Sequence, residues 1–161
     1  MKTPVLYIET SIFGFYFDDR IENGFKVQAV KELLGQIKAG AFHAFVSPVV
    51  VDELSRAPHP YGEKLLKLID TFNLQLCTAE SKAVDKLFSK YMRAKIVPDD
   101  YEDDARHVAY ATILKADSLV SYNLAHLANE WSNRRFNKIS ISSGYSAVPI
   151  RTPEEVVRYD Y

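Results

Sequence analysis

The amino-acid sequence predicts an α/β fold in which a parallel sheet is covered by helices on both faces. Short apolar runs alternate along the chain with longer segments whose apolar residues recur at the i, i+3, i+4, i+7 spacing of an amphipathic helix. Such alternation is typical of parallel sheets. The chain has 161 residues without a visible repeat or low-complexity segment, so we expect a single domain over residues 1–161.

The first half of the chain supplies three of the expected strands. In order, the expected elements are a strand at 4–8, a helix at 26–39, a strand at 41–47, a helix carrying 50–56, a helix around 65–69 and a short strand at 72–77. Gly40 is well placed to end the first helix. Ser47 followed by Pro48 predicts an N-cap with proline at the first helical position.

The second half continues the alternation. The expected elements are a helix at 79–94, a loop at 96–103, a helix from about 101 to 116, a strand at 117–123 and a last strand followed by a helix within 147–157. Thr152 and Pro153 predict the start of that last helix, and two glutamates follow in its first turn.

Composition excludes several classes of protein. The chain has 20 Lys and Arg against 21 Asp and Glu, so a strongly cationic surface is excluded. A single cysteine, Cys77, excludes an internal disulfide and a cysteine-based zinc site, and fits a reducing compartment. No uninterrupted apolar stretch approaches the roughly 20 residues that span a bilayer. We therefore expect a cytoplasmic protein without a membrane partner.

Four acids or amides follow the expected strands. Glu9 lies just past the first strand, Asn123 just past the fourth, Glu53 in the helix after the second, and Asp104 in the first turn of the helix that leads to the fourth. Ligands of open parallel sheets bind beyond the carboxyl ends of the strands, so these side chains can converge. Gathered carboxylates repel one another, and a divalent cation relieves that cost. Oxygen ligands select Mg²⁺ or Mn²⁺, which indicates metal-assisted phosphodiester hydrolysis.

Each of these residues also has a purely structural interpretation. Glu9 can be a solvated residue at a strand end, and Asp104 a first-turn acid favoured by the helix dipole. Glu53 can be an exposed residue paired with Arg56 or a lysine, and Asn123 a turn or N-cap residue. Their common position at the carboxyl edge of the sheet is what favours a site.

Four segments, "LYIETSIFG", "SPVVVDELSRA", "YEDDARHVAYATILKADSLVSYNLAHLAN" and "IRTPEEVV", resemble PIN-domain proteins, in particular the stand-alone, VapC-like members. The resemblance covers residues 4–157. It implies a three-layer α/β/α fold and a Mg²⁺- or Mn²⁺-dependent ribonuclease site. By motif, Glu9 takes the place of the usual first acid, Glu53 the second and Asp104 the third, whereas Asn123 stands where many members carry a fourth Asp.

The resemblance implies an endoribonuclease that leaves a 5′-phosphate and forms the toxin half of a toxin–antitoxin pair. Glu9, Glu53 and Asp104 would hold the metal ion, and Asn123 would orient water or metal. Glutamate in place of aspartate at position 9 and asparagine at position 123 depart from the usual pattern. These departures leave open a second interpretation, a catalytically degenerate PIN module that binds RNA or a protein partner.

Further candidates surround these acids. Thr10 and Ser11 are hydroxyl neighbours of Glu9 and candidate substrate-binding residues. His107, on the helical face of Asp104, either contacts substrate phosphate and the metal's surroundings or packs against the sheet with one nitrogen bonded. His126 follows Asn123 by three residues and has the same two interpretations.

Basic and aromatic residues are interleaved in residues 129–138. Arg134 and Arg135 lie beside Trp131 and Phe136, so this stretch either grips RNA or forms a solvated helix face with two core aromatics. The apolar run at 13–17 is either core or a surface for a homodimer or an antitoxin peptide.

Overall fold

The computed structural model describes residues 2–159, and its centre is a five-stranded, all-parallel sheet. The strand order is β3-β2-β1-β4-β5. The strands are β1 (Val5–Ile8), β2 (His43–Val46), β3 (Gln75–Leu76), β4 (Ser118–Val120) and β5 (Ile150–Arg151). Tyr7 in the central strand pairs with Phe45 on one side and Leu119 on the other. The expected parallel sheet is confirmed.

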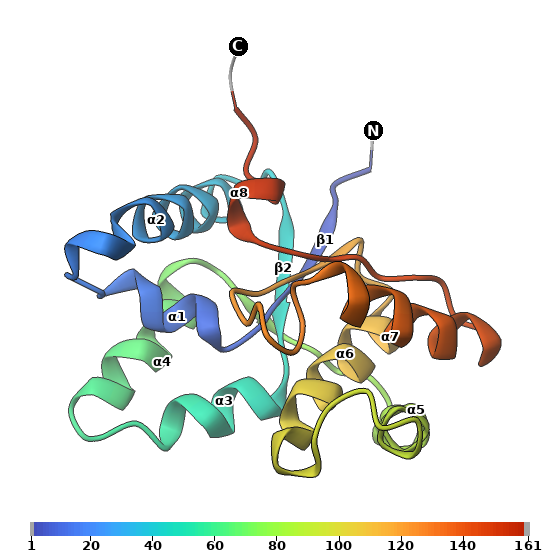
Figure 1. Ribbon diagram of the computed structural model, residues 1–161. Helices are drawn as coiled ribbons and strands as arrows, with labels where there is room; N and C mark the ends of the chain where they lie inside the picture. Colours follow the sequence, from blue (N-terminus) through green and yellow to red (C-terminus); the bar gives the residue numbers. More distant parts are fainter. Residues whose placement is uncertain (1, 160–161) are drawn as a thin grey trace.

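Helices cover both faces of this sheet, which gives a three-layer α/β/α fold. They are α1 (Ser11–Tyr16), α2 (Gly24–Lys38), α3 (Pro48–Ser55), α4 (Tyr61–Thr71), α5 (Ser81–Arg93), α6 (Glu102–Leu114), α7 (Glu130–Ser142) and α8 (Pro153–Val156), with 3₁₀ turns η1 (Ile21–Asn23) and η2 (Asp99–Tyr101). Figure 1 shows α1, α2 and α4 to one side of the strands and α5, α6 and α7 to the other. Helix α3 contacts both α4 and α6.

Local signals in the sequence explain several element boundaries. The Ser47 hydroxyl accepts a hydrogen bond from the Val49 N–H, so α3 begins at Pro48 as its N-cap predicts. Helix α2 ends before Gly40, whose φ of +91° is the left-handed conformation that glycine adopts at low cost. Helix α8 begins after Thr152, whose N–H and hydroxyl both donate to Glu155.

Helix α1 was not expected as a helix. Its sequence SIFGFY is almost continuously apolar, so it carries no helical period. Ile12 and Phe13 are fully buried, whereas Phe17 just beyond the helix is 43% exposed. The apolar run therefore divides between core and exposed surface, and its use by a protein partner stays a prediction.

The sheet order places a topological switch point between β1 and β4. The chain runs from β1 outward through β2 and β3, and returns to the other side of β1 as β4 and β5. In such sheets the crevice beyond the carboxyl ends of the two diverging strands is the usual ligand site. The N–H of Glu9 donates to the Val120 carbonyl at 3.0 Å, so the two strand exits lie side by side. Within residues 2–159, no helix is long and apolar enough to cross a membrane.

Candidate active site at the carboxyl edge of the sheet

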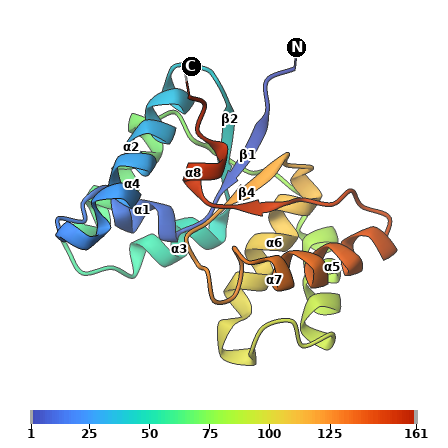
Figure 2. The same ribbon diagram turned by 45° about the horizontal axis from the view of Figure 1, so that its top comes forward.

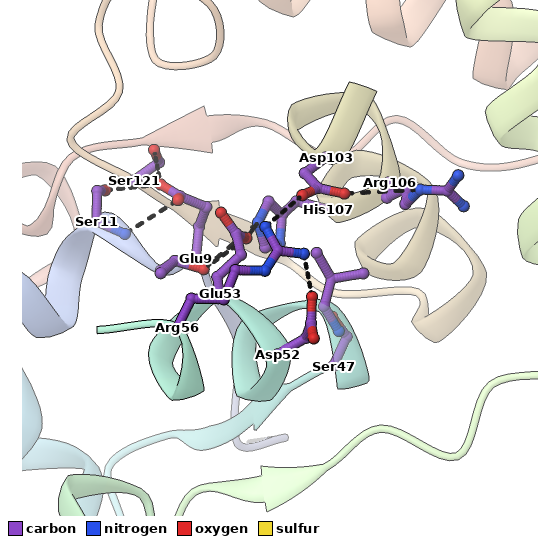
Figure 3. A network of polar contacts seen from close by, with 12 residues as sticks. Glu9, Ser11, Ser47, Asp52, Glu53, Arg56, Asp103, Arg106, His107 and Ser121 are labelled. Atoms are coloured by element: carbon purple, nitrogen blue, oxygen red, sulfur yellow. Dashed lines mark hydrogen bonds and ion pairs between the residues drawn. The ribbon is translucent and has the colours of Figure 1, made fainter. Parts of the chain in front are cut away.

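Glu9 is a buried carboxylate that two serines hold in place. Its Oε2 accepts the Ser11 N–H at 3.0 Å, and its Oε1 accepts the hydroxyls of Ser11, at 2.6 Å, and Ser121. Each hydroxyl in turn accepts a backbone N–H from the exit of β4, that of Tyr122 or Asn123, at 2.9 Å. Figure 3 shows Glu9 between these serines. The acid is therefore not the solvated strand-end residue of the structural interpretation.

Glu53 is the outer end of a series of hydrogen-bonded side chains that extends into the core. Its Oε1 accepts the Thr10 hydroxyl at 2.9 Å and His107 Nε2 at 2.6 Å. His107 Nδ1 lies 2.7 Å from the Tyr7 hydroxyl, which lies 2.7 Å from Ser47 Oγ. The N-cap of α3, Ser47, is thus linked through β1 and α6 to Glu53, about one and a half turns further along the same helix. The structural interpretation expected Glu53 to pair with Arg56, but Glu53 pairs with His107 instead.

The pKa values of His107 and Glu53 move in opposite directions. Burial alone would lower the pKa of His107, but the hydrogen bond to Glu53 and the charges of Glu9, Glu53 and Asp104 raise it above its usual range. Burial would raise the pKa of Glu53, but His107 and Thr10 lower it. Both directions favour the charged forms, so the two side chains form an ion pair.

Asp104 lies in the first turn of α6, as expected, and pairs with His126. His126 Nδ1 is 2.9 Å from Asp104 Oδ2, and the His126 ring lies 4.3 Å from the ring of Tyr101, centroid to centroid. Burial raises the pKa of Asp104, and the charge of Glu9 adds to this rise, while the His126 hydrogen bond opposes it. The charge of Glu9 thus acts on Asp104, and the charges of all three acids act on His107.

Asn123 has a structural role in the loop after β4. Its Oδ1 accepts the His126 N–H at 3.1 Å, and its backbone carbonyl accepts the N–H groups of Leu127 and Ala128. Its side-chain oxygen, the atom that can coordinate a cation, is therefore already used in a turn.

Asp103 and Asp52, which lie outside the three-acid site, form ion pairs with arginines. Asp103 Oδ2 lies 3.8 Å from Arg56 and Asp103 Oδ1 lies 3.7 Å from Arg106, while Arg56 also pairs with Asp52 (Figure 3). The guanidinium of Arg106 lies over the Phe88 ring at 4.0 Å. The charge of Asp103 is thus compensated outside the three-acid site.

The basic and aromatic stretch of α7 divides between structure and surface. Arg135 donates to the carbonyls of Ala94 and Lys95 at 3.1 and 3.2 Å, and so binds the end of α5. Phe136 is fully buried, whereas Trp131 is 67% exposed. Arg134 forms an exposed ion pair with Glu130. Of the two aromatics that the helix-face interpretation expected in the core, Phe136 is buried and Trp131 is not, and contact of Arg134 and Arg135 with RNA stays a prediction.

Glu53 and Asp104 are each anchored through one oxygen, whereas Glu9 is held through both. Within residues 2–159, Glu53 Oε2 and Asp104 Oδ1 accept no hydrogen bond, and no unpartnered polar side-chain atom is buried, so both oxygens reach solvent. No three Asp, Glu, His or Cys side chains of the described chain lie close enough to hold a metal ion as they stand. The oxygen donors fit Mg²⁺ or Mn²⁺ by chemistry, and Mg²⁺ usually keeps several waters between itself and the protein.

The sequence interpretation missed three polar residues of the site. Ser121, Tyr7 and Ser47 position the acids but lie in or beside apolar strands, where a hydroxyl carries little signal. Ser121 was detectable only by its place two residues before Asn123. Comparison with models of known protein families finds none that matches the chain, and no curated protein sequence matches it.

Proposed function

We propose that this chain is a PIN-type, metal-dependent endoribonuclease that hydrolyses RNA phosphodiester bonds. The observation that carries this proposal is the gathering of Glu9, Glu53 and Asp104 at the switch point of a parallel sheet, two of them with an open oxygen toward solvent. Carboxylates in this position suit hard divalent cations, and such cations bind phosphates.

Glu9, Glu53 and Asp104 would hold the ion, Mg²⁺ or Mn²⁺, which when bound activates a water and neutralises charge on the phosphate. The protein's own polar residues fix these three ligands. Ser11 and Ser121 orient Glu9, and His107 and Thr10 orient Glu53.

The third acid is oriented from the loop after β4. His126 holds one oxygen of Asp104, and Asn123 fixes the turn on which His126 sits. Such outer partners determine both the position and the basicity of ligands. Asn123 therefore acts through the loop in this proposal.

The proposal extends to a cytoplasmic toxin of a toxin–antitoxin pair, with RNA as substrate and a homodimer or an antitoxin as protein partner. Exposed apolar side chains at the corner of α1 and α2 support a protein partner. Ile21 is 95% exposed and Phe25 is 91% exposed, which is unusual for large apolar residues at a free surface.

A degenerate PIN module that binds RNA or protein without turnover is the second candidate. The use of the Asn123 oxygen in a turn favours it, because a neutral amide oxygen that already accepts a hydrogen bond is a weaker ligand than a free carboxylate. The two candidates differ in metal binding.

Calorimetric titration of Mn²⁺ into the wild-type protein and into Asp104→Ala separates them. The nuclease proposal expects binding by the wild type, its loss in Asp104→Ala, and no metal-dependent cleavage by that variant with the fold retained. Asp70→Ala, an exposed acid of α4, is the matched control and should bind Mn²⁺ like the wild type. Unchanged binding in Asp104→Ala would reject the site, and no binding by the wild type would favour the degenerate module.

A further inference from the structure

A basic groove lies between α5 and α7, away from the acidic site. Two adjoining hollows occur where the second half of α5 meets the end of α7, and they share Lys90 and Ser143. Lys86 lines one hollow, and Arg93 and Ser142 line the other. Figure 2 shows α5, α6 and α7 together on one side of the sheet. We call this surface the α5–α7 groove.

The cations of the groove are not neutralised. Lys86, Lys90 and Arg93 follow the i, i+4, i+7 spacing, so they share one face of α5. Within residues 2–159 none of the three forms an ion pair, and no acidic residue lines either hollow. Lys90 Nζ donates to Ser143 Oγ at 3.1 Å, which holds the half-buried ammonium in the floor of the groove.

The acidic site creates a need for such a surface. Three carboxylates at the sheet edge repel a polyanion, and the net charge of −1 gives no general attraction. An RNA strand must therefore be held by cations placed elsewhere. Helix α5, which carries the cations of the groove, packs along α6, whose first turn carries Asp104. Arg135 of α7 donates to the carbonyl of Ala94, just after α5, and so ties the two helices together.

We propose that the α5–α7 groove binds the phosphate backbone of an RNA strand. The choice of RNA as the polyanion rests on the proposed function. The concave shape supports a strand, because a chain of phosphates can enter a channel between two helices whereas a flat anionic membrane contacts convex surfaces. Lys90, in the floor of the groove, is reached only by a ligand that enters it.

The test compares two double variants with the same change in net charge. Lys86→Gln with Arg93→Gln removes two cations of the groove, and Lys64→Gln with Lys67→Gln removes two exposed cations of α4. Binding of a short, fluorescein-labelled single-stranded RNA is measured by anisotropy at several salt concentrations in EDTA, so that neither metal nor cleavage contributes.

The groove variant should bind RNA at least about tenfold more weakly than the α4 variant. The magnitude of the slope of log K against log salt should also decrease by about 1.4, because each of the two lost phosphate contacts accounts for about 0.7. Equal binding by the two variants would overturn the proposal, as would a wild type that binds no RNA. Stronger loss of binding to vesicles of phosphatidylcholine and phosphatidylserine than to RNA would also overturn it.

Mn²⁺ calorimetry on the same proteins separates this proposal from the nuclease proposal. Both double variants should bind Mn²⁺ like the wild type, because neither touches the three acids. Loss of RNA binding in the groove variant supports the groove even when the wild type binds no Mn²⁺, a result that counts against the nuclease alone. Intact Mn²⁺ binding with equal RNA binding by the two variants counts against the groove alone.

Discussion

The candidate site contains two acid–histidine pairs that differ in burial. The His107 side chain is 0% exposed and pairs with Glu53, whereas the His126 side chain is 24% exposed and pairs with Asp104. His107 uses both ring nitrogens, one toward Glu53 and one toward Tyr7 in the central strand. His126 uses only Nδ1 of its ring in hydrogen bonds within the described chain, and the ring lies against exposed Tyr101.

The difference in burial of the two histidines indicates that one pair mainly stabilises the fold and the other mainly positions a carboxylate of the site. Removing one partner of a buried pair leaves an uncompensated charge in a poorly solvated place, which is strongly destabilising. The His126 side chain is 24% exposed, so water can replace it beside Asp104, and its removal should cost less than the removal of a fully buried histidine. The Glu53–His107 pair should therefore contribute to folding, and the Asp104–His126 pair mainly to the position of one carboxylate.

The largest effect is expected for His107→Ala. This substitution removes a fully buried ring with its bonds to Tyr7 and Glu53 and opens a cavity beside Tyr7, so the free energy of unfolding should fall by about 3–5 kcal/mol. Urea denaturation in EDTA measures it. His59→Ala is the matched control, since His59 forms an exposed i, i+4 pair with Glu63, 83% and 57% exposed. Similar losses in the two variants would contradict the assigned role of burial.

An intermediate effect is expected for Tyr7→Phe. The substitution keeps the ring in the core but leaves His107 Nδ1 and Ser47 without their shared partner, at a cost of about 1–3 kcal/mol. Tyr16→Phe is the control, because the Tyr16 hydroxyl makes no hydrogen bond within residues 2–159. If thermal and urea denaturation do not distinguish the two variants, the buried polar chain is not what stabilises the pair.

The sequence predicted the fold well because its signals are local. Apolar periods, the Ser47–Pro48 cap and Gly40 act within a few residues, and the strand-exit rule brings distant acids to one edge of the sheet. It did not predict partners. His107 was expected to bond through at most one nitrogen, but Tyr7, 100 residues earlier, supplies the second contact. A helical period tells which face a residue occupies but not which side chain it meets.

The contacts of Glu9 are a second example of partners that the sequence did not predict. The sequence interpretation treated glutamate at position 9 only as a departure from the usual aspartate. The structure places two serine hydroxyls on the carboxylate, one from Ser11 beside it and one from Ser121 across the switch point. Only the three-dimensional contact between β1 and β4 reveals that the longer side chain is fixed in place.

The smallest effect on stability is expected for His126→Ala. The His126 side chain is 24% exposed and water can take its place, so the free energy of unfolding should fall by only about 1 kcal/mol. Because His126 fixes one oxygen of Asp104, Mn²⁺ affinity measured calorimetrically should fall by about tenfold, as for other outer partners of metal-binding carboxylates. His43→Ala, an exposed histidine of β2, should change neither quantity. Unchanged Mn²⁺ affinity in His126→Ala would mean that the backbone of α6 alone positions Asp104. A large loss of stability would mean that the Asp104–His126 pair stabilises the fold as the Glu53–His107 pair does. The two pairs would then differ in exposure but not in role.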